Sequence, residues 1–204
     1  MITSLINSAR STLELVRSGE VLRWLILLEL SDLMLDIFLG YIPLYLADIA
    51  GLRHPQISLV LSALMVIDLG ADALLIPLLR RFHPRNIVRL SAITTVVVYG
   101  FWLILPLPVT RIALLLIVRC TTLGWYQILQ GEAYAAANGR SAAVNAIGAV
   151  TGLCGVALTW LIGWLASQAG LSTAMWLLLL GPLGLAIFVP RPVSEKENHD
   201  SWRS

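Results

Sequence analysis

Residues Trp24–Gly40 read WLILLELSDLMLDIFLG, an apolar run interrupted by the carboxylates of Glu29, Asp32 and Asp36. A helix of about 20 mainly apolar residues spans a bilayer, so a run of this kind belongs to a membrane helix. An ionised side chain at the bilayer centre costs roughly 2.5 to 3.5 kcal/mol. The three acids are spaced by three and four residues and therefore share one helix face. We expect this face to point into a hydrated or charged interior instead of lipid.

The composition of the 204-residue chain extends this interpretation to the whole sequence. The chain is 58% hydrophobic and 13% charged, with a mean hydropathy of +0.82, whereas soluble domains carry about 25% charged residues. Six apolar runs with short connections predict six transmembrane helices, at Val21–Ala47, Ile57–Leu79, Ile87–Pro106, Val109–Gln130, Ala142–Ser167 and Leu171–Val189. Helices are expected because they satisfy their own backbone hydrogen bonds in lipid. The sequence thus predicts an all-α polytopic membrane bundle over residues 21–189, an amphipathic linker over 1–20 and a polar tail over 190–204.

The Lys and Arg residues predict the orientation of this bundle. Short cytoplasmic loops carry an excess of these cations. Most of them lie in the N-terminal arm, the second and fourth loops and the C-terminal tail, whereas the other side holds only Arg53 and Arg111. An even number of spans places both termini on one side, so we expect both in the cytoplasm. The slight basic excess reflects this topology, and no nucleic-acid binding is expected.

Polar side chains also line up inside the other spans. The fourth span carries a stripe at steps of three and four residues, formed by Arg119, Thr122, Tyr126 and Gln130. In the second span, Asp68 and Asp72 lie one turn apart. A carboxyl that can exchange a proton for a partner suits proton-coupled transport, and it also attracts a cationic substrate. The alternative is a structural ion pair between Arg119 and one acid, although the acids outnumber this cation.

Small residues form a ridge along the fifth span. They recur at steps of three and four residues, at Asn145, Gly148, Gly152 and Gly155. Small residues let helix backbones approach closely in lipid. We expect this ridge, together with Asp68, Asp72, Arg80 and Arg81, at a helix interface or gate. The alternative for the ridge is plain static packing.

Three segments resemble the C-terminal six-helix half of a major facilitator superfamily transporter. Gly70–Leu90 is similar to the basic loop after the eighth helix, and Gly124–Tyr134 is similar to the end of the tenth. Residues 139–192 resemble the eleventh and twelfth helices of bacterial members. The loop signature is echoed by Gly70, Asp72, Arg80, Arg81 and Arg85. The glycine that the family places between the acid and the basic residues is missing here.

The resemblance implies two inverted three-helix repeats whose first helices line a central cavity. It implies a secondary transporter half that moves a small organic molecule by proton coupling, with efflux as the assumed direction. The substrate and proton pathway would comprise Glu29, Asp32, Asp36, Arg119, Tyr126 and Gln130. A complete member has about twelve spans. The chain is therefore expected to be a fragment, to pair with a separate N-terminal half, or to form a homodimer. The alternative function is a truncated, non-transporting membrane protein or partner subunit.

No enzymatic activity is expected. The three histidines lie outside the predicted spans, so no buried base is present for an intramembrane serine protease. Asp68 and Asp72 lack the second acidic motif that metal-dependent lipid transferases need. We expect no metal and no cofactor. The expected partners are the lipid bilayer and an unidentified small molecule, and the expected location is a bacterial-type cell membrane.

Overall fold

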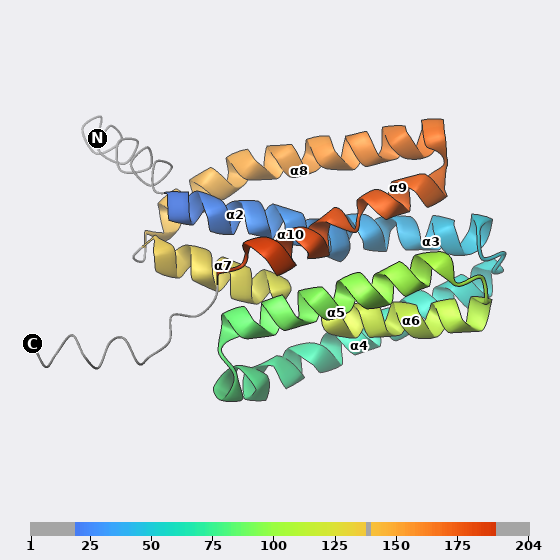
Figure 1. Ribbon diagram of the computed structural model, residues 1–204, viewed down its shortest axis with the longest axis horizontal. Coiled ribbons are helices and arrows are strands. Elements are labelled where there is room, and N and C mark those ends of the chain that lie inside the picture. Colours follow the sequence, from blue (N-terminus) through green and yellow to red (C-terminus); the bar gives the residue numbers. More distant parts are fainter. Residues whose placement is uncertain (1–18, 138–139, 191–204) are drawn as a thin grey trace, which may run out of the picture.

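The computed structural model describes residues 19–137 and 140–190, and these residues form an all-helical bundle (Figure 1). No strand occurs in these two ranges, which confirms the prediction of an all-α chain. The elements in chain order are α2 (Gly19–Asp32), the π-helical turn η1 (Leu33–Ile37), α3 (Phe38–Asp48), α4 (His54–Arg81), α5 (Pro84–Ile104), α6 (Pro108–Thr121), α7 (Trp125–Ala136), α8 (Ser141–Ala169), α9 (Leu171–Leu177) and α10 (Leu180–Phe188). The predicted segments 1–20 and 190–204 fall almost wholly outside the described residues.

Several of these helices have the length and hydropathy of membrane spans. Within the described ranges, four stretches are long and apolar enough to cross a membrane: Pro84–Ile104, Val109–Ala136, Val144–Ala169 and Leu171–Phe188. Helix α4 makes a fifth if its two arms, which are bent by 44°, form one span. The chain therefore has the make-up of an integral membrane protein. The first predicted span consists of α2, η1 and α3, with 14, five and 11 residues in direct succession, and its membrane crossing stays a prediction.

Proline and glycine set most of the helix boundaries. Prolines occupy the first turn of α4, α5 and α6, where the missing N–H costs nothing and the fixed φ angle favours helix. Gly124 separates α6 from α7 with φ +77°, and Gly170 separates α8 from α9 with φ +87°. Both conformations lie in the region that glycine adopts without steric cost. The same two residue types thus produce the short connections that let successive helices run side by side.

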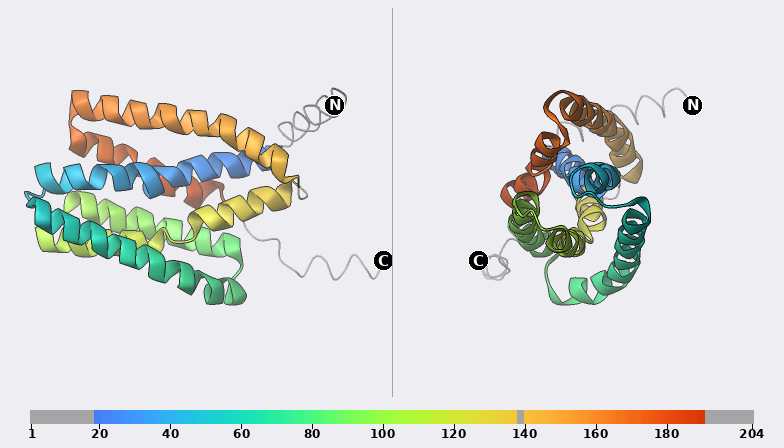
Figure 2. Two further views of the ribbon diagram at one scale, coloured as in Figure 1. Left: turned by 180° about the vertical axis from the view of Figure 1, so that it is seen from behind. Right: turned by 90° about the vertical axis from the view of Figure 1, so that its right-hand side faces the viewer.

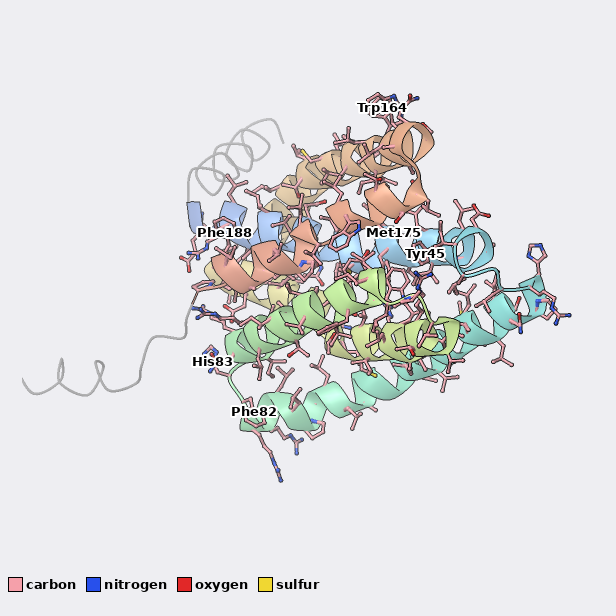
Figure 3. The ribbon with its side chains drawn as sticks, turned by 45° about the vertical axis from the view of Figure 1, so that its right-hand side comes forward. Tyr45, Phe82, His83, Trp164, Met175 and Phe188 are labelled. Carbon is pink, nitrogen blue, oxygen red and sulfur yellow. The ribbon has the colours of Figure 1, made fainter. Side chains whose placement is uncertain are left out.

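Helices α2 and α3 form the centre of the bundle. In the end-on view of Figure 2 they lie between α8, the α9–α10 pair, α5 and α7. The packing around α3 is aromatic. Phe38 meets Tyr99 and Trp102 edge-on, with ring centroids 5.2 and 5.5 Å apart, and Tyr45 lies 4.5 Å from Trp102. The buried Tyr99 hydroxyl donates to the Met175 carbonyl at 2.8 Å. These contacts join α3, α5 and α9, and Figure 3 labels Tyr45 on α3 and Met175 on α9.

Helices α4 and α8 lie at the periphery and keep much of their apolar surface uncovered. Helix α4 packs on α6 and on the end of α3, and α8 packs on α2 and α9. Leu59 and Leu69 on α4 are 72% and 79% exposed, and Val156 and Trp160 on α8 are 68% and 69% exposed. Figure 2 shows these two helices flanking one side of the central α2–α3 stretch. Apolar surface of this extent suits lipid or another membrane-embedded unit.

The first and last described helices meet at one end of the bundle. The Arg23 guanidinium on α2 donates to the Phe188 carbonyl at the end of α10, with Nε 3.0 Å from the oxygen. At the same end, Arg85 forms an ion pair with Glu132 at 2.7 Å and lies over the Trp24 ring, 5.2 Å from its centroid. These polar contacts fasten α2, α5, α7 and α10 together.

Candidate polar cavity

A polar cavity of about 450 Å³ opens where three separate stretches of chain approach one another. The stretch from α2 to α3 supplies two acids, α4 supplies a third, and α6 supplies a cation. The charged lining residues are Asp32, Asp36, Asp68 and Arg119. The junction between α6 and α7 completes the wall with Thr122, Leu123, Gly124, Trp125, Tyr126 and Gln127. Charges from three predicted spans thus share one space.

Arg119 and Asp68 form a two-pronged ion pair across this cavity. Arg119 Nε lies 2.5 Å from one carboxylate oxygen of Asp68, and the terminal Nη2 lies 2.8 Å from the other. This planar match of a guanidinium with a carboxylate is stronger and more directional than a single contact. The side chains are 15% and 31% exposed, so the pair is partly shielded from the surroundings. It links the middle of α4 to the last turn of α6.

Asp32 and Asp36 flank the π-helical turn in the first predicted span. Asp32 is the last residue of α2 and is half-buried, whereas Asp36 lies in η1 and is exposed. Within the described ranges the ion pairs are Arg119 with Asp68 and Arg85 with Glu132, so neither of these acids has one. Insertions that produce π-turns occur frequently at functional sites. The cavity thus holds two acids in addition to Asp68, which Arg119 balances.

The junction between α6 and α7 is a fixed break in the fourth predicted span. Gly124 adopts a left-handed conformation, and a Cβ atom there would lie 2.6 Å from Leu75 Cδ1 on α4. On one side of the break, the Thr122 hydroxyl donates to the Arg119 carbonyl at 3.0 Å. On the other side, Trp125 Nε1 donates to Ser91 Oγ on α5 at 2.7 Å. Contacts from α4 and α5 therefore hold the broken segment beside the cavity.

The acidic stripe predicted for the first span divides between two places. Asp32 and Asp36 line the cavity, but Glu29 does not. The Glu29 carboxylate lies against α8, where a Cβ atom on Gly155 would be 2.6 Å from its Oε2 atom. Glu29 lies one turn before Asp32 on the same helix face. At that position α8 covers the face, so the Glu29 side chain contacts α8 and does not reach the cavity.

The polar stripe predicted for the fourth span is interrupted by the break at Gly124. Arg119 precedes the break and Tyr126 follows it, and both line the cavity, with Tyr126 43% exposed. Gln130 is not among the lining residues, and Gln127 is. The α7 residues that line the cavity end at Gln127, and Gln130 lies about one turn further along the same helix.

The remaining predicted residues lie at helix contacts and helix ends. Asn145 accepts a hydrogen bond from the Tyr134 hydroxyl at 2.8 Å, which joins α8 to α7. A Cβ atom on Gly148 would lie 4.0 Å from Leu25 on α2, whereas one on Gly152 would meet nothing within 4 Å. The described arginines of the predicted gate, Arg80 and Arg81, are exposed at the end of α4, and the Asp72 side chain lies outside the described residues.

Three features of the site were not specified by the sequence reasoning. Asp68 was expected at an interface, but its role as the partner of Arg119 was not predicted. A signal for it existed, because Arg119 is the one arginine in the middle of a predicted span and Asp68 lies at a similar depth in another. The contribution of Gln127 and the Arg85–Glu132 pair were also missed. No cluster of three or more His, Cys, Asp or Glu side chains with metal-binding geometry occurs among the described residues.

No family model, curated protein or solved structure matches this chain. The resemblance to the major facilitator superfamily consequently stays a prediction from the sequence. The functional proposal rests on the membrane character of the helices and on the geometry of the polar cavity.

Proposed function

We propose that the chain is half of a secondary transporter of the major facilitator type and moves a small organic molecule through the polar cavity. The observation that carries the proposal is the convergence of Asp32, Asp36, Asp68 and Arg119, from three predicted spans, on one space. Ionisable side chains at membrane depth are expensive, and they mark substrate and proton pathways. A bundle that needed only stability would be expected to fill these positions with apolar residues.

The charge of the cavity favours cations. Arg119 is balanced by Asp68 at 2.5 Å, which leaves Asp32 and Asp36 without a partner of opposite charge in the described ranges. A protonated amine together with one proton, or two protons, would restore neutrality at these two carboxylates. Exchange of the one for the other provides a physical route to proton-coupled movement of a cationic substrate. The apolar lining residues Leu35, Leu39 and Leu123 suit the hydrocarbon part of such a molecule.

Two irregular helices beside the cavity support a transport mechanism. The π-turn η1 interrupts the first predicted span, and the break at Gly124 interrupts the fourth. Discontinuous helices beside a midplane site are common in secondary transporters, where repeats rock around a fixed site. In this proposal the first and fourth spans are equivalent members of two inverted repeats, six spans cross the membrane, and both termini lie in the cytoplasm.

Transport requires a partner unit in this proposal. The exposed apolar surfaces of α4 and α8 flank the side on which α2 and α3 are least covered (Figure 2). A second six-helix unit there would enclose the polar cavity and give it two alternating openings. A separate N-terminal half and a second copy of this chain both meet the requirement. If neither binds, the chain is a non-transporting membrane protein, as a fragment would be.

Proteoliposomes containing the chain, alone and with candidate N-terminal halves, provide the test. Uptake and release of a fluorescent amine are measured under an imposed proton gradient. The double variant Asp32→Asn and Asp36→Asn is expected to lose proton-driven movement. Asp48→Asn, at the exposed end of α3, is the matched control and is expected to keep it. Equal transport by the double variant and the control would reject the role of the cavity acids.

A further inference from the structure

A second cavity, of about 500 Å³, lies between α4, α5 and α6. Most of its wall is aliphatic or aromatic. The lining residues include Leu74 and Leu78 on α4, Phe82 directly after α4, and Leu90 on α5. Leu74 and Leu90 are each 69% exposed, so the cavity is a groove that opens to the outside of the bundle. The groove shares only Leu123 with the polar cavity and is a separate site.

The serine and threonine hydroxyls in the groove wall are already engaged with the protein. Ser91 Oγ donates to the Val88 carbonyl at 3.0 Å and accepts from Trp125 Nε1 at 2.7 Å. Thr94 Oγ1 donates to the Leu90 carbonyl at 3.0 Å. Apart from Asn86 and Cys120, the lining therefore presents hydrocarbon and engaged hydroxyls to a ligand. On a helix that crosses a membrane, a groove of this kind faces lipid acyl chains, which are as apolar as leucine.

The groove ends at a basic mouth. Phe82 and Asn86 line it where α4 turns into α5, and Figure 3 shows Phe82 beside His83 at this end of the bundle. Arg80 and Arg81 are exposed directly before Phe82, and Arg89 follows one turn into α5. In contrast to Arg85, which Glu132 neutralises, these three arginines form no ion pair within the described ranges. Guanidinium groups bind phosphate oxygens in a two-pronged geometry.

We propose that the groove binds one anionic phospholipid, with an acyl chain between α4, α5 and α6 and the headgroup phosphate at Arg80, Arg81 and Arg89. The apolar wall accounts for the chain, and the uncompensated arginines account for the preference for an anionic lipid. Basic clusters next to a membrane helix attract anionic lipids by about 1 kcal/mol for each arginine. This site requires only that the bundle lies in a membrane, and it is independent of the transport proposal.

Native mass spectrometry of the full chain tests the headgroup part. The purified protein is exchanged into micelles containing phosphatidylglycerol and phosphatidylcholine with the same acyl chains in equal amounts. We expect retention of one phosphatidylglycerol in preference to phosphatidylcholine. The variant R80Q/R81Q is expected to lower the retained ratio roughly five-fold for each arginine. The control R53Q/R140Q removes two exposed arginines elsewhere and is expected to leave the ratio unchanged.

A second pair of variants tests the acyl-chain part. Thr94→Phe places an aromatic ring in the groove, whereas Ile93→Phe changes a neighbouring residue that is 46% exposed and does not line it. Thr94→Phe is expected to abolish preferential retention of phosphatidylglycerol, and Ile93→Phe is expected to preserve it. Equal retention of the two lipids by the unmodified chain would overturn the proposal. An unchanged ratio in R80Q/R81Q, or in Thr94→Phe, would overturn it as well.

Discussion

Removal of one charged partner from the Arg119–Asp68 pair should destabilise the bundle. Loss of the arginine and loss of the aspartate should lower the free energy of unfolding by different amounts. The pair is two-pronged, with contacts of 2.5 and 2.8 Å, and its side chains are 15% and 31% exposed. Loss of one partner costs about 3–5 kcal/mol for a buried pair, whereas a fully exposed pair is worth about 1 kcal/mol or less. Partial exposure places Arg119→Gln between these limits, at about 1–3 kcal/mol.

Asp68→Asn should cost less than Arg119→Gln because the cavity is acidic. Without Arg119, three carboxylates share the cavity with no cation, whereas without Asp68 the arginine still has Asp32 and Asp36 in the same space. In the double variant both members of the pair are neutral, so most of the loss should be recovered. The expected coupling energy between the two sites is about 1–2 kcal/mol.

The measurement is a double-mutant cycle of urea unfolding in detergent micelles, followed by tryptophan fluorescence. Asp48→Asn and Arg53→Gln form the matched control cycle, because both residues lie near the α3–α4 connection and form no ion pair in the described ranges. The control changes should add. If the changes at Arg119 and Asp68 also add within about 0.5 kcal/mol, the ion pair makes no contribution and the reasoning is refuted.

Four further substitutions test the packing by the same unfolding measurement. Gly181→Ala should cost about 1–3 kcal/mol, because its Cβ atom would lie 2.6 Å from the Leu30 backbone carbonyl. A Cβ atom on Gly152 meets nothing within 4 Å, so Gly152→Ala should be neutral or stabilising by up to about 1 kcal/mol. Equal effects of the two substitutions would contradict the α2–α10 contact. Gly124→Ala should cost about 1–2 kcal/mol, because φ is +77° there, and an effect no larger than that of Gly152→Ala would exclude that conformation. Tyr99→Phe should cost about 1 kcal/mol, because it removes a buried hydroxyl that donates at 2.8 Å, and an unchanged stability would show that this hydrogen bond is not formed.

The helical class of the fold was predictable because it depends on local physics. Apolar runs of membrane length with few charges are compatible with helices, and prolines in the first turns define several starts. The number of membrane crossings does not follow from local physics alone, since α2, η1 and α3 contain a π-turn and three acids. Hydropathy alone does not decide whether such a stretch spans a membrane.

The site was predictable only as far as the helical period extends. The four-residue step between Asp32 and Asp36 correctly puts both acids at one cavity. The same spacing does not place Gln130 at the cavity, since the α7 residues that line it end at Gln127, about one turn earlier. The partner of Arg119 depends on the register between α4 and α6, which is a tertiary property. No spacing within a single helix contains that information.

The hydrogen bond from Arg23 to the Phe188 carbonyl has a practical consequence for genetic fusions. Because it draws the start of α2 and the end of α10 together, we expect reporters fused beyond these two helices to be found in the same compartment. Two copies joined in tandem would then need only a short tether on that side, and both copies would keep a common orientation.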